Sequence, residues 1–184
     1  MPFGEYIPFR KFLGEILDFM GINLIDTLKG QAYSTIKSGS IRISPSICYE
    51  IAFPNLVRKT AKNSDLLVTI SNDTWFGRSI GPEQHLEIAQ TRALEHQKSL
   101  IRATNSGISA IISRKGKILD KQVFFEEKEL KNKVKIYAGN TPFSIFGNYL
   151  IYCYIVLIYM YLLFCKATNV LKFIKRTKNG KKFE

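Results

Sequence analysis

The feature that most restricts how this chain can fold is an uncharged segment near its C-terminal end. Residues 145–165 contain no charged side chain, and Asn148 is their only strongly polar residue. A helix of this length extends roughly 30 Å, which matches the hydrocarbon core of a bilayer. The alternative is a buried core helix, but such helices rarely stay uncharged for so long and then meet a basic segment. We therefore expect one transmembrane helix at residues 145–165.

Positive charge is concentrated directly after this segment. The net charge of +12 fits nucleic-acid binding, anionic lipid or a membrane-orientation signal. Residues 166–184 hold one acid, Glu184, against seven basic side chains: Lys166, Lys172, Lys175, Arg176, Lys178, Lys181 and Lys182. By the positive-inside rule, this basic tail is cytoplasmic and the preceding domain lies across the membrane. This tail carries +6, half of the net charge, which is explained by orientation and attraction to anionic lipid, and we expect no nucleic-acid partner.

Residues 1–144 have the pattern of an α/β domain. Apolar and alternating runs predict strands leading to Cys48 and at residues 66–70, 108–112 and 118–119. Helical patterns occupy residues 12–19, 51–62 and 82–98, and loops are expected at 1–10 and 30–39. Strands that alternate with helices favour an α/β sandwich over a helical bundle.

Cys48 is the candidate nucleophile. It stands at the end of a strand-like run, where a sulfur can be exposed for attack. The next residue, Tyr49, offers a backbone N–H as an oxyanion donor. A small structural cysteine is the alternative, and from spacing alone it is the commoner case. Cys153 and Cys165 lie within the apolar segment, and the three cysteines form neither a disulfide framework nor a metal pattern.

Two further segments have the composition of binding loops. Residues 71–77 follow a buried strand and contain the only tryptophan, Trp75, beside Phe76. Residues 3–6 place the Glu5 carboxylate among aromatic side chains. A solvated turn and a surface loop are the respective alternatives. His96 lies within a predicted helix as an ordinary surface or core residue, and no zinc or serine–histidine–acid pattern is present.

Together, six segments in fixed order resemble bacterial apolipoprotein N-acyltransferases, a branch of the nitrilase superfamily. They are Pro2-Phe3-Gly4-Glu5-Tyr6-Ile7-Pro8, Ile47-Cys48-Tyr49-Glu50, Ser71-Asn72-Asp73-Thr74-Trp75-Phe76-Gly77, Gly81-Pro82-Glu83-Gln84-His85, Arg92-Ala93-Leu94-Glu95 and Arg102-Ala103-Thr104-Asn105-Ser106-Gly107-Ile108-Ser109. The resemblance extends over residues 1–165. It implies a nitrilase-like αββα sandwich on the outer face of the bacterial inner membrane, followed by one transmembrane helix.

The resemblance also implies a reaction and a set of site residues. A cysteine takes an acyl chain from a phospholipid as a thioester and passes it to the N-terminal diacylglyceryl-cysteine of a lipoprotein, with no cofactor and no metal. Cys48 matches the nucleophile, Glu5 an additional glutamate, and Tyr49 and Glu50 the neighbours of the nucleophile. Trp75, with Phe76, matches an aromatic loop near the lipid site. Asn72 and Asn105 match supporting positions.

The family's base glutamate and catalytic lysine precede the segment that begins at Pro2, so we expect the sequence to be the C-terminal portion of such an enzyme. It would then be a partial sandwich, inactive unless an upstream fragment supplies both residues. A non-catalytic membrane-anchored remnant and a nitrilase-like amidase for small amides are the competing hypotheses. The apolar segment and the Trp75-Phe76 loop argue against the amidase.

Overall fold

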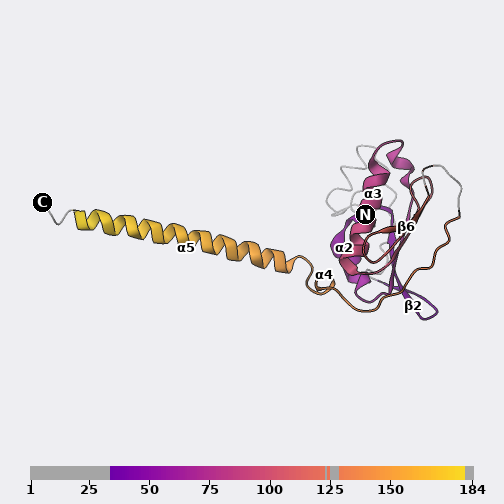
Figure 1. The fold of residues 1–184 in the computed structure, drawn as a ribbon, viewed down its shortest axis with the longest axis horizontal. Coiled ribbons are helices and arrows are strands. Elements are labelled where there is room, and N and C mark those ends of the chain that lie inside the picture. Colours follow the sequence, from indigo (N-terminus) through magenta and orange to yellow (C-terminus); the bar gives the residue numbers. More distant parts are fainter. Residues whose placement is uncertain (1–33, 123, 125–128, 181–184) are drawn as a thin grey trace, which may run out of the picture. The chain divides into compact units, whose positions relative to one another are not determined.

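The computed structural model describes residues 34–122, 124 and 129–180, with residues 167–180 described by their backbone alone. It separates into two units, Met1–Ile145 and Phe146–Glu184, which are considered one at a time (Figure 1). The predicted loop at residues 1–10, the predicted helix at 12–19 and the candidate site residue Glu5 lie outside the described residues.

A six-stranded mixed sheet organises the first unit. Its strands follow one another in chain order across the sheet: β1 (Ile36–Ser38), β2 (Ile41–Ile47), β3 (Leu66–Ser71), β4 (Leu100–Thr104), β5 (Ala110–Ile112) and β6 (Ile118–Lys121). The three central strands β2, β3 and β4 are parallel, and the outer strands pair antiparallel. The helices between parallel strands return the chain to the same edge, so the carboxyl ends of β2, β3 and β4 lie together.

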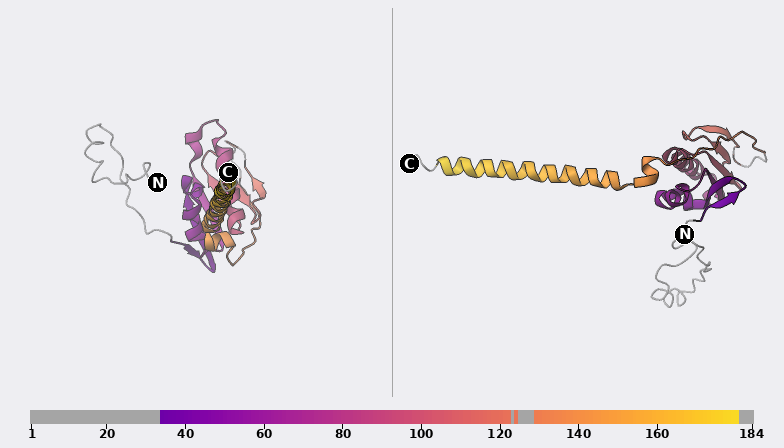
Figure 2. Two further views of the ribbon diagram at one scale, coloured as in Figure 1. Left: turned by 90° about the vertical axis from the view of Figure 1, so that its left-hand side faces the viewer. Right: turned by 90° about the horizontal axis from the view of Figure 1, so that it is seen from below.

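Two helices cover one face of this sheet. They are α2 (Pro54–Ala61), which follows the short helix η1 (Cys48–Ala52), and α3 (Gly81–His96). Figure 2 shows both helices on the same side of the strands. Proline stands in the first turn of each helix, where its missing N–H costs nothing. Between the helices and the sheet lies the hydrophobic core, which includes Val57, Ala61, Leu67, Leu86, Ala89, Ala93, Leu100 and Ile112.

The opposite face of the sheet is apolar and partly exposed. Ile47 of β2 pairs in register with Ile70 of β3, and these side chains are 56% and 54% exposed. In a sandwich, such a face packs against a second sheet. The mixed sheet with helices on one face agrees with the α/β, nitrilase-like fold class that the sequence predicted.

The local predictions agree with most of the described elements. The strands ending at Cys48 and beginning at Leu66 are β2 and β3, and the two helical patterns are α2 and α3. The loop expected at residues 30–39 is wrong in part, because residues 36–38 form β1. The strand β4 was not predicted, since Arg102 interrupts its apolar pattern.

The second unit is dominated by α5 (Tyr149–Gly180), which follows the short helix α4 (Pro142–Phe146). Gly147 separates the two helices with a φ of +57°, a conformation that glycine adopts without steric cost. Within α5, the segment Tyr149–Lys166 has a mean hydropathy of 1.8, and none of its residues is buried. It is the one helix among the described residues that is long and apolar enough to cross a membrane. The helix starts later than the expected residue 145 and continues into the basic tail.

Candidate active site

Cys48 occupies a strained backbone position at the end of β2. Its φ is +50°, in the left-handed region that residues with a β-carbon rarely adopt. Residue 48 is also the first residue of η1, so the chain turns sharply from strand to helix at the sulfur. Strain of this kind persists where the surrounding structure enforces it, often at functional sites. The side chain is partly exposed, as a nucleophile requires.

Ser71 brings the neighbouring strand to the sulfur. The carboxyl ends of β2 and β3 are adjacent because Ile47 pairs with Ile70. Cys48 follows Ile47 and Ser71 follows Ile70, so these two residues are also neighbours. Ser71 Oγ lies 3.5 Å from Cys48 Sγ. The same hydroxyl lies 2.6 Å from Asp73 Oδ1. Ser71 thus connects the thiol to a carboxylate.

Asp73 is the centre of a buried polar cluster. It is almost fully buried, as are His85 and Arg102. Its Oδ1 accepts a hydrogen bond from the Ser71 hydroxyl and lies 3.1 Å from His85 Nδ1. Its Oδ2 accepts a hydrogen bond from an Arg102 guanidinium N–H at 2.5 Å. Arg102 also donates through Nε to the Ile108 carbonyl oxygen at 3.1 Å. Three sequence segments therefore converge on one carboxylate.

The cluster keeps Asp73 ionised. Burial opposes its negative charge, but hydrogen bonds from His85 and Ser71 and the charge of Arg102 outweigh that effect. The pKa of Asp73 is lowered to about 2, so this carboxylate is anionic at any physiological pH. Burial also lowers the pKa of Arg102, and Asp73 partly offsets this. At neutral pH both charges persist and compensate each other.

The cluster also orients the His85 ring. Asp73 Oδ1 and an Arg102 guanidinium nitrogen are each 3.1 Å from His85 Nδ1. A proton on Nδ1 is donated to the anionic carboxylate, because the Arg102 guanidinium is a donor and cannot accept it. The ring lies against aromatic neighbours, with centroids 6.1 Å from Tyr49 and 5.7 Å from Phe76. His85 therefore connects the buried charges to the aromatic rings of Tyr49 in η1 and Phe76 in the segment after Asp73.

The two residues after the cysteine, both predicted as catalytic, are placed differently. The Glu50 carboxylate accepts a hydrogen bond from the backbone N–H of Ile47 at 2.8 Å and thereby closes the turn that carries Cys48. The Tyr49 ring is exposed and packs edge-on against Phe53, with centroids 6.0 Å apart. Glu50 thus holds the turn in shape, while Tyr49 is available at the surface.

The residues predicted for substrate binding lie on η2 (Asp73–Phe76). Trp75 is 88% exposed, whereas Phe76 is half-buried against His85. Of the predicted supporting residues, Asn72 begins this helix by accepting from Thr74 N–H at 3.2 Å and from its hydroxyl at 2.6 Å. The Asn105 backbone N–H donates to the Ser71 carbonyl oxygen at 3.0 Å, and the Asn105 side chain is exposed.

Four residues of the cluster had no role assigned from the sequence: Ser71, Asp73, His85 and Arg102. All four occur within the segments that carry the family resemblance. The available signal was their position, since Ser71 and Asp73 follow a buried strand whose end faces Cys48. Their mutual contact depends on the pairing of β3 with β4 and on the path of α3, which sequence patterns did not specify.

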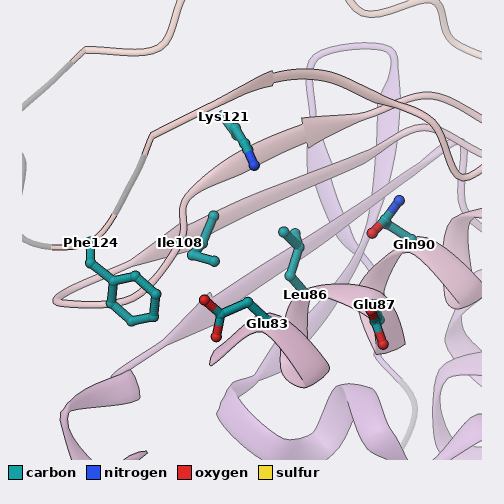
Figure 3. Close-up of a pocket in the computed structure, with 7 residues that line it drawn as sticks. All are labelled: Glu83, Leu86, Glu87, Gln90, Ile108, Lys121 and Phe124. Atoms are coloured by element: carbon teal, nitrogen blue, oxygen red, sulfur yellow. The ribbon is translucent and has the colours of Figure 1, made fainter. Parts of the chain in front are cut away.

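A separate small pocket lies beside α3 and the end of β6. Figure 3 shows its lining residues, which are Glu83, Leu86, Glu87, Gln90, Ile108, Lys121 and Phe124. Ile108 is the residue it shares with the surroundings of Arg102. It contains neither Cys48 nor the aromatic loop residues, so the candidate active site is the Cys48 cluster.

The chain is similar to known proteins over most of its length. Residues 4–135 match the family model described as carbon-nitrogen hydrolase. Apolipoprotein N-acyltransferase of Wigglesworthia glossinidia brevipalpis is 44% identical over 163 residues, which cover 85% of this chain and 33% of that protein. The Haemophilus influenzae protein of the same name is 40% identical over 181 residues, covering 97% of this chain and 34% of that protein. The chain thus spans about a third of the length of these curated relatives.

A solved structure with a similar fold is the carbon-nitrogen hydrolase from Helicobacter pylori G27. Its TM-score is 0.50 at 16% sequence identity, and the match covers 55% of this chain and 43% of that chain. At this level of identity the similarity concerns the fold alone.

Proposed function

The chain belongs to the carbon-nitrogen hydrolase family, and on this premise we propose that it is the C-terminal portion of an apolipoprotein N-acyltransferase. Two relatives with that name share 44% and 40% of its residues over most of its length. The observation that carries the proposal is Cys48, which is partly exposed at a strained turn where two parallel strands end. This is the placement that a thioester-forming nucleophile needs.

The proposed reaction has two steps. The Cys48 thiolate attacks an ester carbonyl of a membrane phospholipid, the carbon–oxygen bond breaks, and the lysophospholipid leaves with a proton. The α-amino group of a diacylglyceryl-cysteine at the N-terminus of a lipoprotein then attacks the thioester. The carbon–sulfur bond breaks, an amide forms, the amine loses a proton, and Cys48 is regenerated. Covalent catalysis divides one difficult transfer into two easier ones.

The surroundings of Cys48 support a lipid substrate. Trp75 is largely exposed near the carboxyl end of β3. Amphipathic aromatic side chains favour the membrane–water interface. The apolar segment Tyr149–Lys166 would keep the site at a bilayer. We propose that the domain is periplasmic and the basic tail cytoplasmic, in the inner membrane.

The proposed activity also needs a base glutamate and a lysine, which the resemblance places ahead of Pro2. We propose that sequence ahead of Pro2 supplies the glutamate and the lysine, since the relatives extend over about three times the length of this chain. The chain by itself is then expected to form no thioester, because nothing at the described site takes the proton of the thiol. Asp73, with a pKa of about 2, is too weak a base at neutral pH.

Labelling of Cys48 by phospholipid tests this function. The purified chain in detergent is incubated with phospholipid carrying a labelled acyl chain, alone and after co-expression with the preceding reading frame. We expect a hydroxylamine-sensitive label with the co-expressed sequence, none in its Cys48→Ala variant, and none on the chain alone. A label on the chain alone would refute the need for upstream residues. No label in either preparation would favour a non-catalytic remnant and refute the proposed reaction.

A further inference from the structure

The Ser71 hydroxyl has one proton and two acceptors within reach. Its oxygen lies 2.6 Å from Asp73 Oδ1 and 3.5 Å from Cys48 Sγ. One O–H donates fully to one acceptor at a time. In the resting state the short distance to the anionic carboxylate favours Asp73, and the sulfur then faces the lone pairs of the hydroxyl. When the sulfur becomes anionic, it competes for the same proton.

Asp73 itself cannot turn away from this arrangement. His85 binds the same carboxylate oxygen as Ser71, and Arg102 binds the other at 2.5 Å. Arg102 is fixed in turn by the Ile108 carbonyl oxygen. A β-carbon at Gly107 would stand 2.6 Å from the β-carbon of Asp73, so the backbone closes the remaining side. Packing of this density holds the carboxylate in a single orientation.

We propose that Ser71 is a positioning residue for the sulfur of Cys48 and that Asp73 decides which acceptor its hydroxyl proton serves. Asp73 holds the proton while the sulfur is a thiol or a thioester. The proton turns to the sulfur when the thiolate forms, before acyl transfer and again as the thioester breaks. No covalent bond to hydrogen changes in this step. The inference rests on the proposed function, because it assigns the thiolate as both nucleophile and leaving group.

Two variants change the hydroxyl in opposite directions. Ser71→Ala removes the donor, so the thiolate loses a stabilising hydrogen bond. Asp73→Asn removes the competing anion, and its amide can donate to Ser71 Oγ, which directs the hydroxyl proton to the sulfur. It also leaves the positive charge of Arg102 uncompensated beneath the site, which favours a thiolate. The first variant should slow reactions of the sulfur and the second should accelerate them.

Alkylation provides a measurement that does not depend on acyl transfer. The full chain in detergent is treated with iodoacetamide from about pH 6 to about pH 9, where thiolates carry the reaction. Mass spectrometry compares Cys48 with Cys153 of the same molecule. We expect Ser71→Ala to slow alkylation of Cys48 by about five- to tenfold and to move its pH profile upward, as for one lost charge-assisted hydrogen bond. Ser71→Thr keeps the hydroxyl and should restore the rate.

A matched control removes another serine hydroxyl from the same sheet. Ser44 of β2 is buried and lies 2.5 Å from the Thr60 hydroxyl, so Ser44→Ala loses a buried hydrogen bond away from the sulfur. Its Cys48 alkylation should equal that of the wild type. If Ser71→Ala did not fold, it would show no cooperative unfolding transition. The alkylation rate of Asp73→Asn would then test the positioning role.

The outcomes separate the two proposals. Unchanged Cys48 alkylation in folded Ser71→Ala, or slower alkylation in Asp73→Asn, would overturn the positioning role. Opposite shifts in the two variants would support it even if no phospholipid label ever appears on Cys48. In that case the acyltransferase function fails while the positioning of the sulfur stands.

Discussion

The Nδ1 atom of His96 lies 2.8 Å from the hydroxyl of Ser144, a residue 48 positions further along the chain. Both residues are buried. Burial, followed by the positive charges of Lys98, Arg92 and Arg58, lowers the pKa of His96 from 6.5 to about 4. The contact joins the end of α3 to α4, and the burial that surrounds it favours the neutral imidazole.

The depressed pKa of His96 predicts a loss of stability in mild acid. An unfolded chain takes up the proton near pH 6.5, whereas the folded chain resists it down to about pH 4. Stability is therefore complete above pH 6.5 and falls through this interval, by up to about 3 kcal/mol. Urea unfolding of the detergent-solubilised chain at several pH values measures it.

The control for this effect is His96→Asn, whose amide reaches the position of Nδ1 without titrating. The difference in unfolding free energy between wild type and variant should shrink as the pH falls from about 6.5 to 4. Asp65 and Asp73 do not confuse the comparison, since the pKa of each is about 2. A difference that stays constant with pH would contradict the assignment to His96.

Thr141 predicts a local stability effect at the start of α4. Its hydroxyl donates to the Glu95 carbonyl oxygen at 2.6 Å and accepts from Ser144 N–H at 3.0 Å. Thr141→Val keeps the shape and loses both bonds, which should cost about 1–2 kcal/mol. Hydrogen exchange at the Ser144 amide should accelerate accordingly. Thr141→Ser, which keeps the hydroxyl, should exchange like the wild type, and equal rates in Val and Ser variants would refute the capping role.

Gly107 predicts a packing defect that reaches the active site. A β-carbon there would lie 2.6 Å from the Asp73 β-carbon and 2.7 Å from its carboxyl carbon. Because Asp73 is held by its buried partners, Gly107→Ala should destabilise the domain by about 1–3 kcal/mol. It should also alter Cys48 alkylation. Ser106→Ala, at an adjacent position, provides the control, and a neutral Gly107→Ala would show that Asp73 has room to move.

Trp75 predicts a fluorescence signal, because the chain contains one tryptophan. If its exposed side chain enters the lipid interface, brominated phospholipids in proteoliposomes should quench its emission, and acrylamide should quench it less than in detergent-free urea. The double variant Trp75→Phe, Tyr152→Trp moves the reporter into α5 as a positive control. Quenching of the control but not of Trp75 would exclude the lipid contact.

Much of the secondary structure could be predicted because the spacing of apolar residues along a short segment shows which of its faces is buried. The run at residues 66–70 and the apolar side of α3 each need only one buried face to be recognised. β1 and β4 were not predicted because neither shows a plain apolar face in the sequence. β1 is an exposed three-residue edge strand, and β4 carries Arg102, whose charge is neutralised by a residue far away in the sequence.

The sequence by itself determined that a strand leads to Cys48, that the chain belongs with carbon-nitrogen hydrolases, and that an apolar helix follows the domain. These properties depend on local pattern and on motif order. Only the tertiary structure decided that Ser71, Asp73, His85 and Arg102 form one cluster, which contacts the sulfur through Ser71. Their contacts arise where parallel strands end side by side and α3 crosses over them, and burying their charges is tolerable only when all of them are brought together at once.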